Sequence, residues 1–84
     1  MEKYELTNNS KIFGWVTVYQ IRALKDFSNV KKGDLGGWIE SEENLSHQDN
    51  AWIYDNARVY GNAEVYGDAK VYDNAKVCGR AEVI

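Results

Sequence analysis

Few side chains in this sequence could carry out chemistry, and none of them has an evident partner. The chain has one histidine, His47, and one cysteine, Cys78, so it cannot supply the nitrogen and sulfur ligands of a typical zinc site. Cys78 also lacks a neighbouring base that would activate it as a nucleophile. The carboxylates are numerous but unpaired, which is typical of a solvated face and leaves calcium as the open metal alternative. We therefore predict no catalytic residue, no metal and no cofactor.

The elements that hold these side chains are short and repeated. From Leu35 onward the sequence divides into six-residue units, mostly with an aliphatic residue first, Gly, Asn or Asp in the third and fourth places, and a small residue fifth. A period of six differs from the helical 3.6 and indicates a solenoid, in which each unit packs on its neighbours. The eight complete units are LGGWIE, SEENLS, HQDNAW, IYDNAR, VYGNAE, VYGDAK, VYDNAK and VCGRAE.

This repeat resembles the hexapeptide-repeat left-handed β-helix family over residues 35–84. The resemblance implies an all-β fold, a left-handed parallel β-helix in which three units form one triangular coil and residues about 18 apart stack at the strand spacing of about 4.8 Å. An uninterrupted register predicts three interior columns, which are Leu35, Ile53 and Val71, then Ser41, Val59 and Val77, then His47, Val65 and Val83.

The same register bears on the one histidine. Acyltransferases of this family use a histidine base that projects from a loop into a cleft between the subunits of a trimer. No inserted loop is evident here and His47 occupies an inward place, so we predict a partly buried structural histidine rather than a general base.

The outward places are the candidate partner-binding positions. Glu64 is predicted to stack on Glu82, and like charges at strand spacing repel unless a basic group binds there. Trp52 is predicted to lie outward beside Lys70. Four successive units carry a tyrosine in the second place, where exposed aromatic rings suit a protein interface and mutual stacking is the alternative. The predicted partner-binding set is Trp52, Tyr54, Tyr60, Glu64, Tyr66, Tyr72 and Glu82.

Residues 1–34 are predicted to cap the solenoid. Two β segments, Tyr4-Glu5-Leu6 and residues 12–24, flank a turn at Asn8-Asn9-Ser10, and a polar linker ends at Gly33-Asp34. Solenoids need caps because the end of a coil is otherwise open. We therefore expect one compact domain, with a β-hairpin-like capping segment at 1–34 and the β-helix at 35–84.

Three stretches extend a second resemblance over nearly the whole chain. YELT at 4–7, IRALKD at 21–26 and KGDLGGWI at 32–39, followed by Tyr-Gly-Asn-Ala repeats, resemble small phage and prophage proteins that often carry the label of putative transferase. The label reflects the repeats, and a fold does not bring an activity with it. The resemblance implies a phage-type protein that acts in the host cytoplasm.

The last unit is predicted to leave an open edge. Unpaired strand edges beside a valine column favour pairing with another chain, so Val77, Val83 and Ile84 are candidate oligomer-interface residues. We expect a homo-oligomer, either two copies stacked end to end about a twofold axis or a trimer formed through the walls.

Composition limits the partner and the location. The 13 acidic and 10 basic residues give a net charge of −3, which argues against direct nucleic-acid binding. The sequence lacks a membrane-length apolar run, and its single cysteine fits a reducing cytoplasm. We therefore predict a protein that is not an enzyme and binds a host protein, with an anti-CRISPR-like inhibitor of a bacterial defence system as the specific hypothesis. The alternatives are a structural module and a degenerate transferase-like protein that binds a small ligand.

Overall fold

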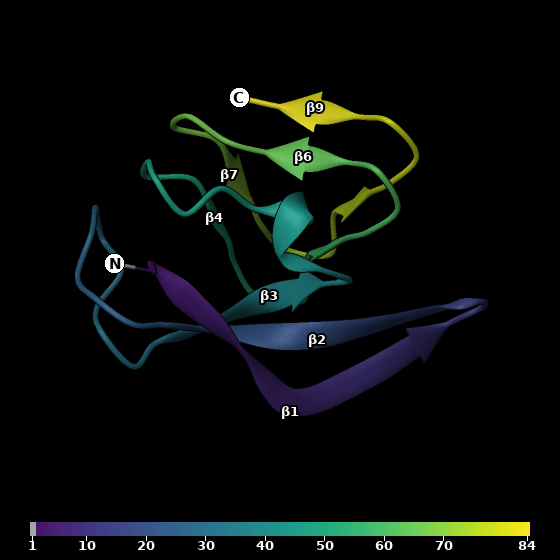
Figure 1. The fold of residues 1–84 in the computed structure, drawn as a ribbon, viewed down its shortest axis with the longest axis horizontal. Coiled ribbons are helices and arrows are strands. Elements are labelled where there is room, and N and C mark those ends of the chain that lie inside the picture. The colour runs from purple at the N-terminus through teal and green to yellow at the C-terminus, as the bar shows by residue number, and fades with distance from the viewer. Residues whose placement is uncertain (1) are drawn as a thin grey trace.

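The computed structural model describes residues 2–84 as an all-β protein in which an antiparallel hairpin leads into short parallel strands (Figure 1). The hairpin consists of β1 (Tyr4–Phe13) and β2 (Val16–Ala23), and β3 (Leu35–Ile39) pairs antiparallel with β2. A 3₁₀ turn, η1 (Glu42–Asn44), follows. The remaining strands have two residues each and are β4 (Trp52–Ile53), β5 (Arg58–Val59), β6 (Glu64–Val65), β7 (Lys70–Val71), β8 (Lys76–Val77) and β9 (Glu82–Val83).

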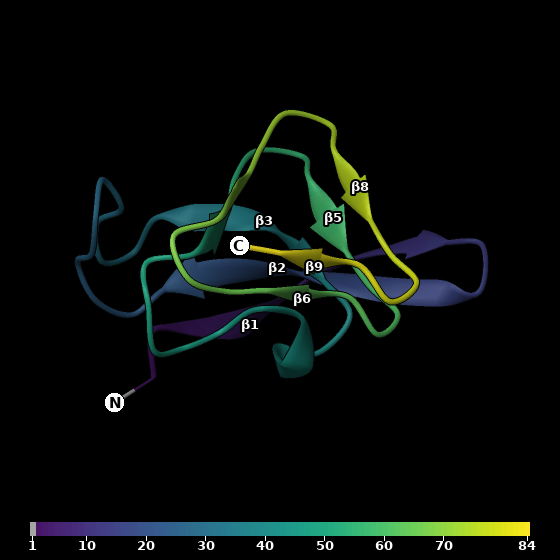
Figure 2. The same cartoon turned by 90° about the horizontal axis from the view of Figure 1, so that it is seen from above.

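The short strands form the three walls of a coil. β5 and β8 continue the sheet of β1, β2 and β3, while β4 pairs with β7 and β6 pairs with β9. Seen from above in Figure 2, β5 and β8 lie along one side of the coil and β6 and β9 along another. The parallel partners are 18 residues apart, and they include Ile53 with Val71, Val59 with Val77, and Val65 with Val83. The predicted stacking of these three pairs is confirmed.

The first coil is longer than the later ones, and the predicted register is wrong there. Ile39 pairs with Val59 and Leu45 bridges to Val65, so these partners are 20 residues apart rather than 18. The two extra residues lie in the corner between Leu45 and β4. Leu35 is consequently 55 % exposed instead of filling the interior. Ser41 and His47 do not lie under the valine columns either, because Ile39 and Leu45 take those places.

The sequence suggested a turn at Asn8-Asn9-Ser10, and this prediction is wrong. The hairpin turns at Gly14 and Trp15 instead. Pairing extends from Tyr4 with Ala23 to Phe13 with Val16, and a register shift lies between Leu6 and Ser10. The three polar residues therefore form an irregular stretch within β1. Gly14 has a φ of 63°, which glycine adopts without steric cost in a tight hairpin. Because β2 pairs with β3, the N-terminal segment extends one wall of the coil by strand addition.

The core runs from the coil interior to the N-terminal segment and includes Trp52. The Trp52 side chain is 1 % exposed. Its ring makes edge-to-face contacts with Phe27 and Tyr4, at 5.2 and 6.3 Å between ring centroids. Trp52 does pair with Lys70 in the ladder, as predicted. The prediction that Trp52 lies outward and binds a partner is wrong, because the N-terminal segment covers the outside of this wall.

Lys3 fastens the N-terminal segment to the long corner of the first coil. Its ammonium is fully buried and donates to the carbonyl oxygens of Asp49 at 3.0 Å and Ala51 at 2.6 Å. The Asp49 carboxylate lies 3.8 Å away. Burial lowers the pKa of Lys3 to about 8, although the negative charge of Asp49 acts in the opposite direction. The two extra residues thus help to form a corner whose carbonyl groups receive a buried amine.

The register can be tested with two leucines that differ in burial. Leu45 is 1 % exposed, so Leu45→Ala should lower the free energy of unfolding by about 2–5 kcal/mol, measured by urea denaturation. Leu35→Ala removes the same atoms from an exposed site and should cost less than about 1 kcal/mol. An equal loss of unfolding free energy in Leu45→Ala and Leu35→Ala would instead support the uninterrupted register.

The burial of Lys3 predicts a dependence of stability on pH. Because its pKa is about 8 in the folded chain and 10.5 ordinarily, the unfolded chain binds more protons between these values. The free energy of unfolding should therefore rise from pH 7.5 to 9.5, by at most about 1.4 kcal/mol per pH unit. Lys3→Met should abolish this rise, whereas Lys70→Met, at an exposed site, should keep it. A rise that survives in Lys3→Met would contradict the assignment.

Candidate functional site

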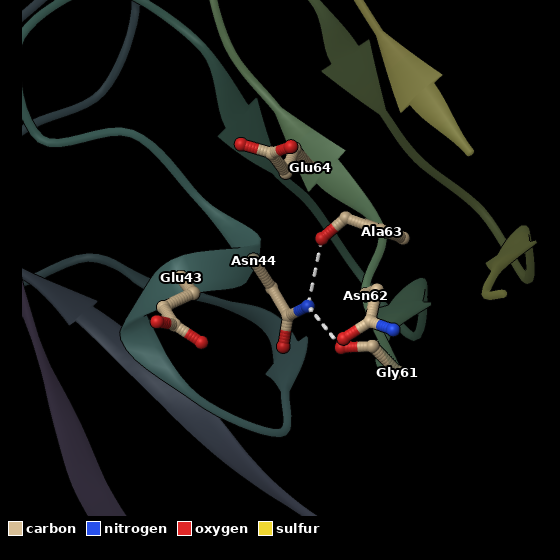
Figure 3. Close-up of a pocket in the computed structure, with 6 residues that line it drawn as sticks. All are labelled: Glu43, Asn44, Gly61, Asn62, Ala63 and Glu64. Atoms are coloured by element: carbon tan, nitrogen blue, oxygen red, sulfur yellow. Dashed lines mark hydrogen bonds between the residues drawn. The ribbon is translucent and has the colours of Figure 1, made fainter. Parts of the chain in front are cut away.

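The β6–β9 wall and the neighbouring η1 corner form an acidic face, which we define as Glu42, Glu43, Glu64, Tyr66 and Glu82. Glu64 pairs directly with Glu82, as predicted, and both side chains are exposed. Two adjacent hollows, of about 380 and 360 Å³, share Glu43 and Glu64 in their linings. Figure 3 shows these two carboxylates around Asn44. Within residues 2–84 neither Glu64 nor Glu82 forms an ion pair.

Asn44 holds the η1 corner against β6 through its side-chain amide. Its Oδ1 accepts from the backbone N–H groups of Glu40 at 3.1 Å and Ser41 at 3.0 Å. Its Nδ2 donates to the carbonyl oxygens of Gly61 at 3.3 Å and Ala63 at 2.8 Å. The side chain is fully buried and all of its hydrogen-bonding groups are satisfied within the chain. The available signal was the spacing from Ser41 to Asn44, which is typical of a capped first helical turn.

The tyrosines of the repeat do not gather into one surface. Tyr54 is half-buried and donates its hydroxyl to Asn29 Oδ1 at 2.9 Å, which ties it to the N-terminal segment. Tyr60 lies beside Cys78, and the thiol raises the pKa of Tyr60. Tyr72 is 59 % exposed at another corner. Among residues 2–84 these rings form no aromatic pair, so the mutual stacking left open by the sequence is not observed.

Tyr66 is the tyrosine that joins the acidic face. Its hydroxyl donates to Glu82 Oε1 at 3.2 Å, and the negative charge of Glu82 raises the pKa of Tyr66. The structure therefore divides the predicted partner-binding set. Glu64, Tyr66 and Glu82 lie together, while Tyr54, Tyr60 and Tyr72 lie at other corners.

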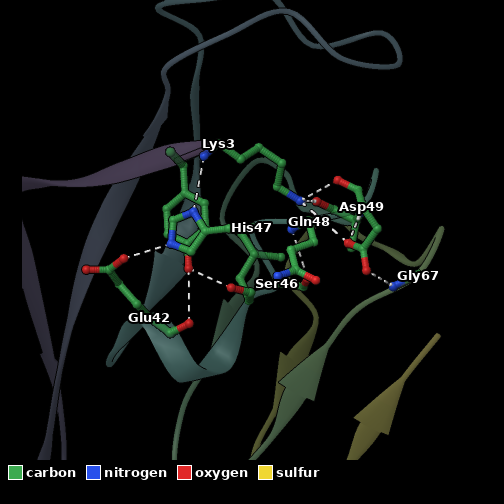
Figure 4. Close-up of polar contacts among 10 residues, drawn as sticks. Lys3, Glu42, Ser46, His47, Gln48, Asp49 and Gly67 are labelled. Atoms are coloured by element: carbon green, nitrogen blue, oxygen red, sulfur yellow. Dashed lines mark hydrogen bonds and ion pairs between the residues drawn. The ribbon is translucent and has the colours of Figure 1, made fainter. Parts of the chain in front are cut away.

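His47 lies at the edge of this face and both of its ring nitrogens are engaged (Figure 4). The Lys3 backbone N–H donates to Nδ1 at 3.1 Å. Because a backbone amide can only donate, Nδ1 must accept, and the proton of the neutral ring is on Nε2. Nε2 lies 2.7 Å from Glu42 Oε1 and donates to it, while the ring stacks on Tyr4 at 4.0 Å between centroids. In this arrangement His47 has no lone pair free to act as a general base.

The same corner contains the described residues that could hold a metal ion. The ligand atoms of Glu2, Glu42 and His47 lie within 4.8 Å of one another. Sequence reasoning did not group them, because Glu2 is distant from the other two along the chain. If Nε2 bound a metal ion, the proton of the neutral ring would have to be on Nδ1, and this N–H would face the backbone N–H of Lys3. A metal ion here would therefore break the hydrogen bond from Lys3 that holds the ring.

The candidate oligomer residues lie at the last coil. Val77 and Val83 are half-buried and Ile84 is 79 % exposed, while Cys78 is half-buried beside them. No helix within residues 2–84 is long and apolar enough to span a membrane.

Comparison with known proteins gives a relative whose name states an activity. No family model matches the sequence. Over 62 residues the chain is 37 % identical to the Escherichia coli (strain K12) protein named uncharacterized acetyltransferase YdcK. The match covers 64 % of this chain and 19 % of that protein, so the chain spans about a fifth of the length of the curated relative that it matches. This likeness fits the predicted resemblance to transferase-like hexapeptide-repeat proteins, and it does not bear on a phage origin.

Proposed function

We propose that this chain is a non-catalytic protein-binding module, built on a left-handed β-helix, whose acidic face binds a positively charged surface of a partner protein. The observation that carries the proposal is the pairing of Glu64 with Glu82, two exposed carboxylates at strand spacing without an ion-pair partner in residues 2–84. Like charges directly opposite each other destabilise a ladder by a few tenths of a kcal/mol. A basic partner would remove this repulsion on binding.

The distribution of charge over the walls also supports a directed interaction. The outward places of β5 and β8 hold Arg58 and Lys76, and that of β7 holds Lys70, while the β6–β9 wall holds only glutamates. A wall of one sign on a chain of net charge −3 steers basic surfaces toward it and increases the association rate.

The state of His47 favours a binding role over acyl transfer. A histidine base must present a free lone pair to the group that it deprotonates. Here Nδ1 accepts from Lys3 and Nε2 donates to Glu42, so a catalytic role would require both bonds to rearrange. The hollow beside the ring is open and its lining includes three carboxylates, those of Glu42, Glu43 and Glu64, which would repel the phosphates of an acyl coenzyme.

The partner class that we propose is the nucleic-acid-binding surface of a bacterial defence enzyme, with this chain as an anti-CRISPR-like inhibitor. Such surfaces are basic, because they neutralise phosphates with Lys and Arg. A ladder of carboxylates can occupy the same surface and compete with nucleic acid. The small acidic chain and its resemblance to phage proteins support this choice of partner.

A charge reversal on the acidic face tests the binding proposal. The tagged chain is used to capture a protein from bacterial lysate, and the affinity for the purified protein is then measured at 50 and 200 mM salt. Glu64→Lys should weaken binding at least about tenfold, because it places a cation against the basic partner. It should also reduce the salt dependence.

The matched control is Glu5→Lys, which makes the same charge change on β1. The Glu5 side chain is 39 % exposed and pairs with Arg22, so its replacement should cost little stability and should leave binding within about twofold. Equal losses in the two variants would show that net charge matters and the acidic face does not. A chain that captures no basic protein would count against the proposal.

A second candidate function, binding of an acyl coenzyme, is favoured by the name of the Escherichia coli relative. A ligand at 100 times its dissociation constant stabilises the folded state by about 2.7 kcal/mol, which thermal unfolding detects readily. We expect no shift of Tm with coenzyme A or acetyl coenzyme A at 1 mM. A saturable rise that Glu42→Gln or His47→Gln removes would support the transferase-like reading instead.

A further inference from the structure

Two buried hydrogen-bond donors on the outer face of the β3–β5–β8 wall have no acceptor. Trp38 pairs with Arg58 in the ladder, and Arg58 pairs with Lys76. Trp38 is 8 % exposed, and its Nε1–H and the Nε–H of Arg58 are both buried without a hydrogen-bond partner in residues 2–84. Buried donors nearly always have an acceptor, so two unpaired donors on neighbouring residues indicate that a bound group supplies one.

The groups around these two donors are mostly further donors. The Lys11 ammonium lies 4.4 Å from the centre of the Trp38 ring, and Lys76 is exposed beside Arg58. None of these three cations forms an ion pair within the part of the chain that the structure describes. On the other side of Trp38, both ends of the Gln20 amide already have partners. The acceptor that this cluster lacks is therefore expected to be an anion.

The closed end of the hairpin covers this cluster. β3 pairs with β2 only from Tyr19 onward, so residues 11–18, which we call the arm, form a two-stranded ribbon that projects beyond β3 (Figure 1). The Phe13 ring of the arm lies 4.1 Å from Arg58 Cζ, and Lys11 belongs to the arm as well. A two-stranded ribbon is marginally stable by itself, so the arm is expected to open more readily than the three-stranded part of the sheet.

We propose that this cluster binds a phosphate group, free or as the monoester of a small molecule, and that the arm is the flap over the site. When the arm lifts, the anion reaches Trp38 Nε1 and Arg58 Nε. When the arm closes, Lys11 donates to the anion from the arm. The ligand is held by charge and hydrogen bonds, and no covalent bond changes. The site lies on a different wall from the acidic face, so it does not depend on the proposed function.

The directions of the donors favour a tetrahedral anion over a planar one. The Trp38 N–H lies in the plane of the indole ring, whereas the Lys11 ammonium lies over the face of that ring. A carboxylate has two oxygens in one plane, while a phosphate monoester has three acceptor oxygens that point in different directions. Its charge of about −1.5 to −2 at pH 7 also matches three cations better than a single negative charge does.

Titration of the isotope-labelled chain with inorganic phosphate, followed by NMR at constant ionic strength, tests the site. The chain has three tryptophans, and their indole N–H signals report separately. The Trp38 signal should move saturably, because its N–H gains an acceptor, and that of the exposed Trp15 should move because the arm is displaced. The signal of Trp52 should stay in place, because that ring lies in the core. Phosphate is used up to about 50 mM, because so small an anion binds weakly.

Two charge-removing variants with a matched control locate the binding. Arg58→Gln and Lys11→Gln should each weaken phosphate binding about tenfold, because each removes a charge-assisted hydrogen bond. Lys70→Gln removes the same charge from an exposed place on β7, on another wall, and should leave binding within about twofold. Thermal unfolding checks that each variant is folded. Lys11 is exposed, so Lys11→Gln decides the matter even where Arg58→Gln fails to fold.

Further probes identify the ligand. Glycerol phosphate that binds more tightly than inorganic phosphate would show that the site takes a monoester, and the reverse order would show that it takes the free ion. Acetate should bind at least about fivefold more weakly than either, because it has one charge and two oxygens. A Trp38 signal that does not move, equal weakening in Lys70→Gln and Lys11→Gln, equal binding of acetate, or tighter binding of a single-stranded oligonucleotide would each overturn the proposal.

Discussion

The backbone hydrogen bonds between successive coils are the constraint on which the rest of this structure depends. Each pass donates N–H groups to carbonyl oxygens of the next pass, so residues at equivalent places are held at strand spacing whatever their side chains are. This places Ile53 under Val71 and fills the interior, and it equally places Glu64 under Glu82. The core and the acidic face are therefore products of one register.

The later coils could be predicted from the sequence because their period is unambiguous. The first coil was predicted in the wrong frame, because Ile39 and Leu45 are themselves six residues apart and keep the period in either frame. The pairing with Val59 and Val65 decides between the frames. The available signal was that the uninterrupted frame puts the polar residues Ser41 and His47 in the aliphatic first place.

The remaining errors arose where tertiary contacts decide the outcome. Trp52 occupies a place that periodicity assigns to the surface, but Phe27 and Tyr4 cover it, and no local pattern reveals a cover from elsewhere in the chain. The partners of His47 come from the same N-terminal segment, so the state of its ring was equally hidden. The Glu64–Glu82 contact, by contrast, needs only the repeat spacing. This pairing is the part of the candidate site that could be predicted from the sequence.

The neighbours of the acidic face limit which of its carboxylates can serve a partner. At the corner Glu42 is engaged by His47, which leaves Glu43 and Glu64 as the carboxylates that line both hollows. On β9, Glu82 accepts from the Tyr66 hydroxyl. Glu43 and Glu64 have no ion-pair partner within residues 2–84. Their charges are therefore the ones on the acidic face that remain available to attract a basic partner.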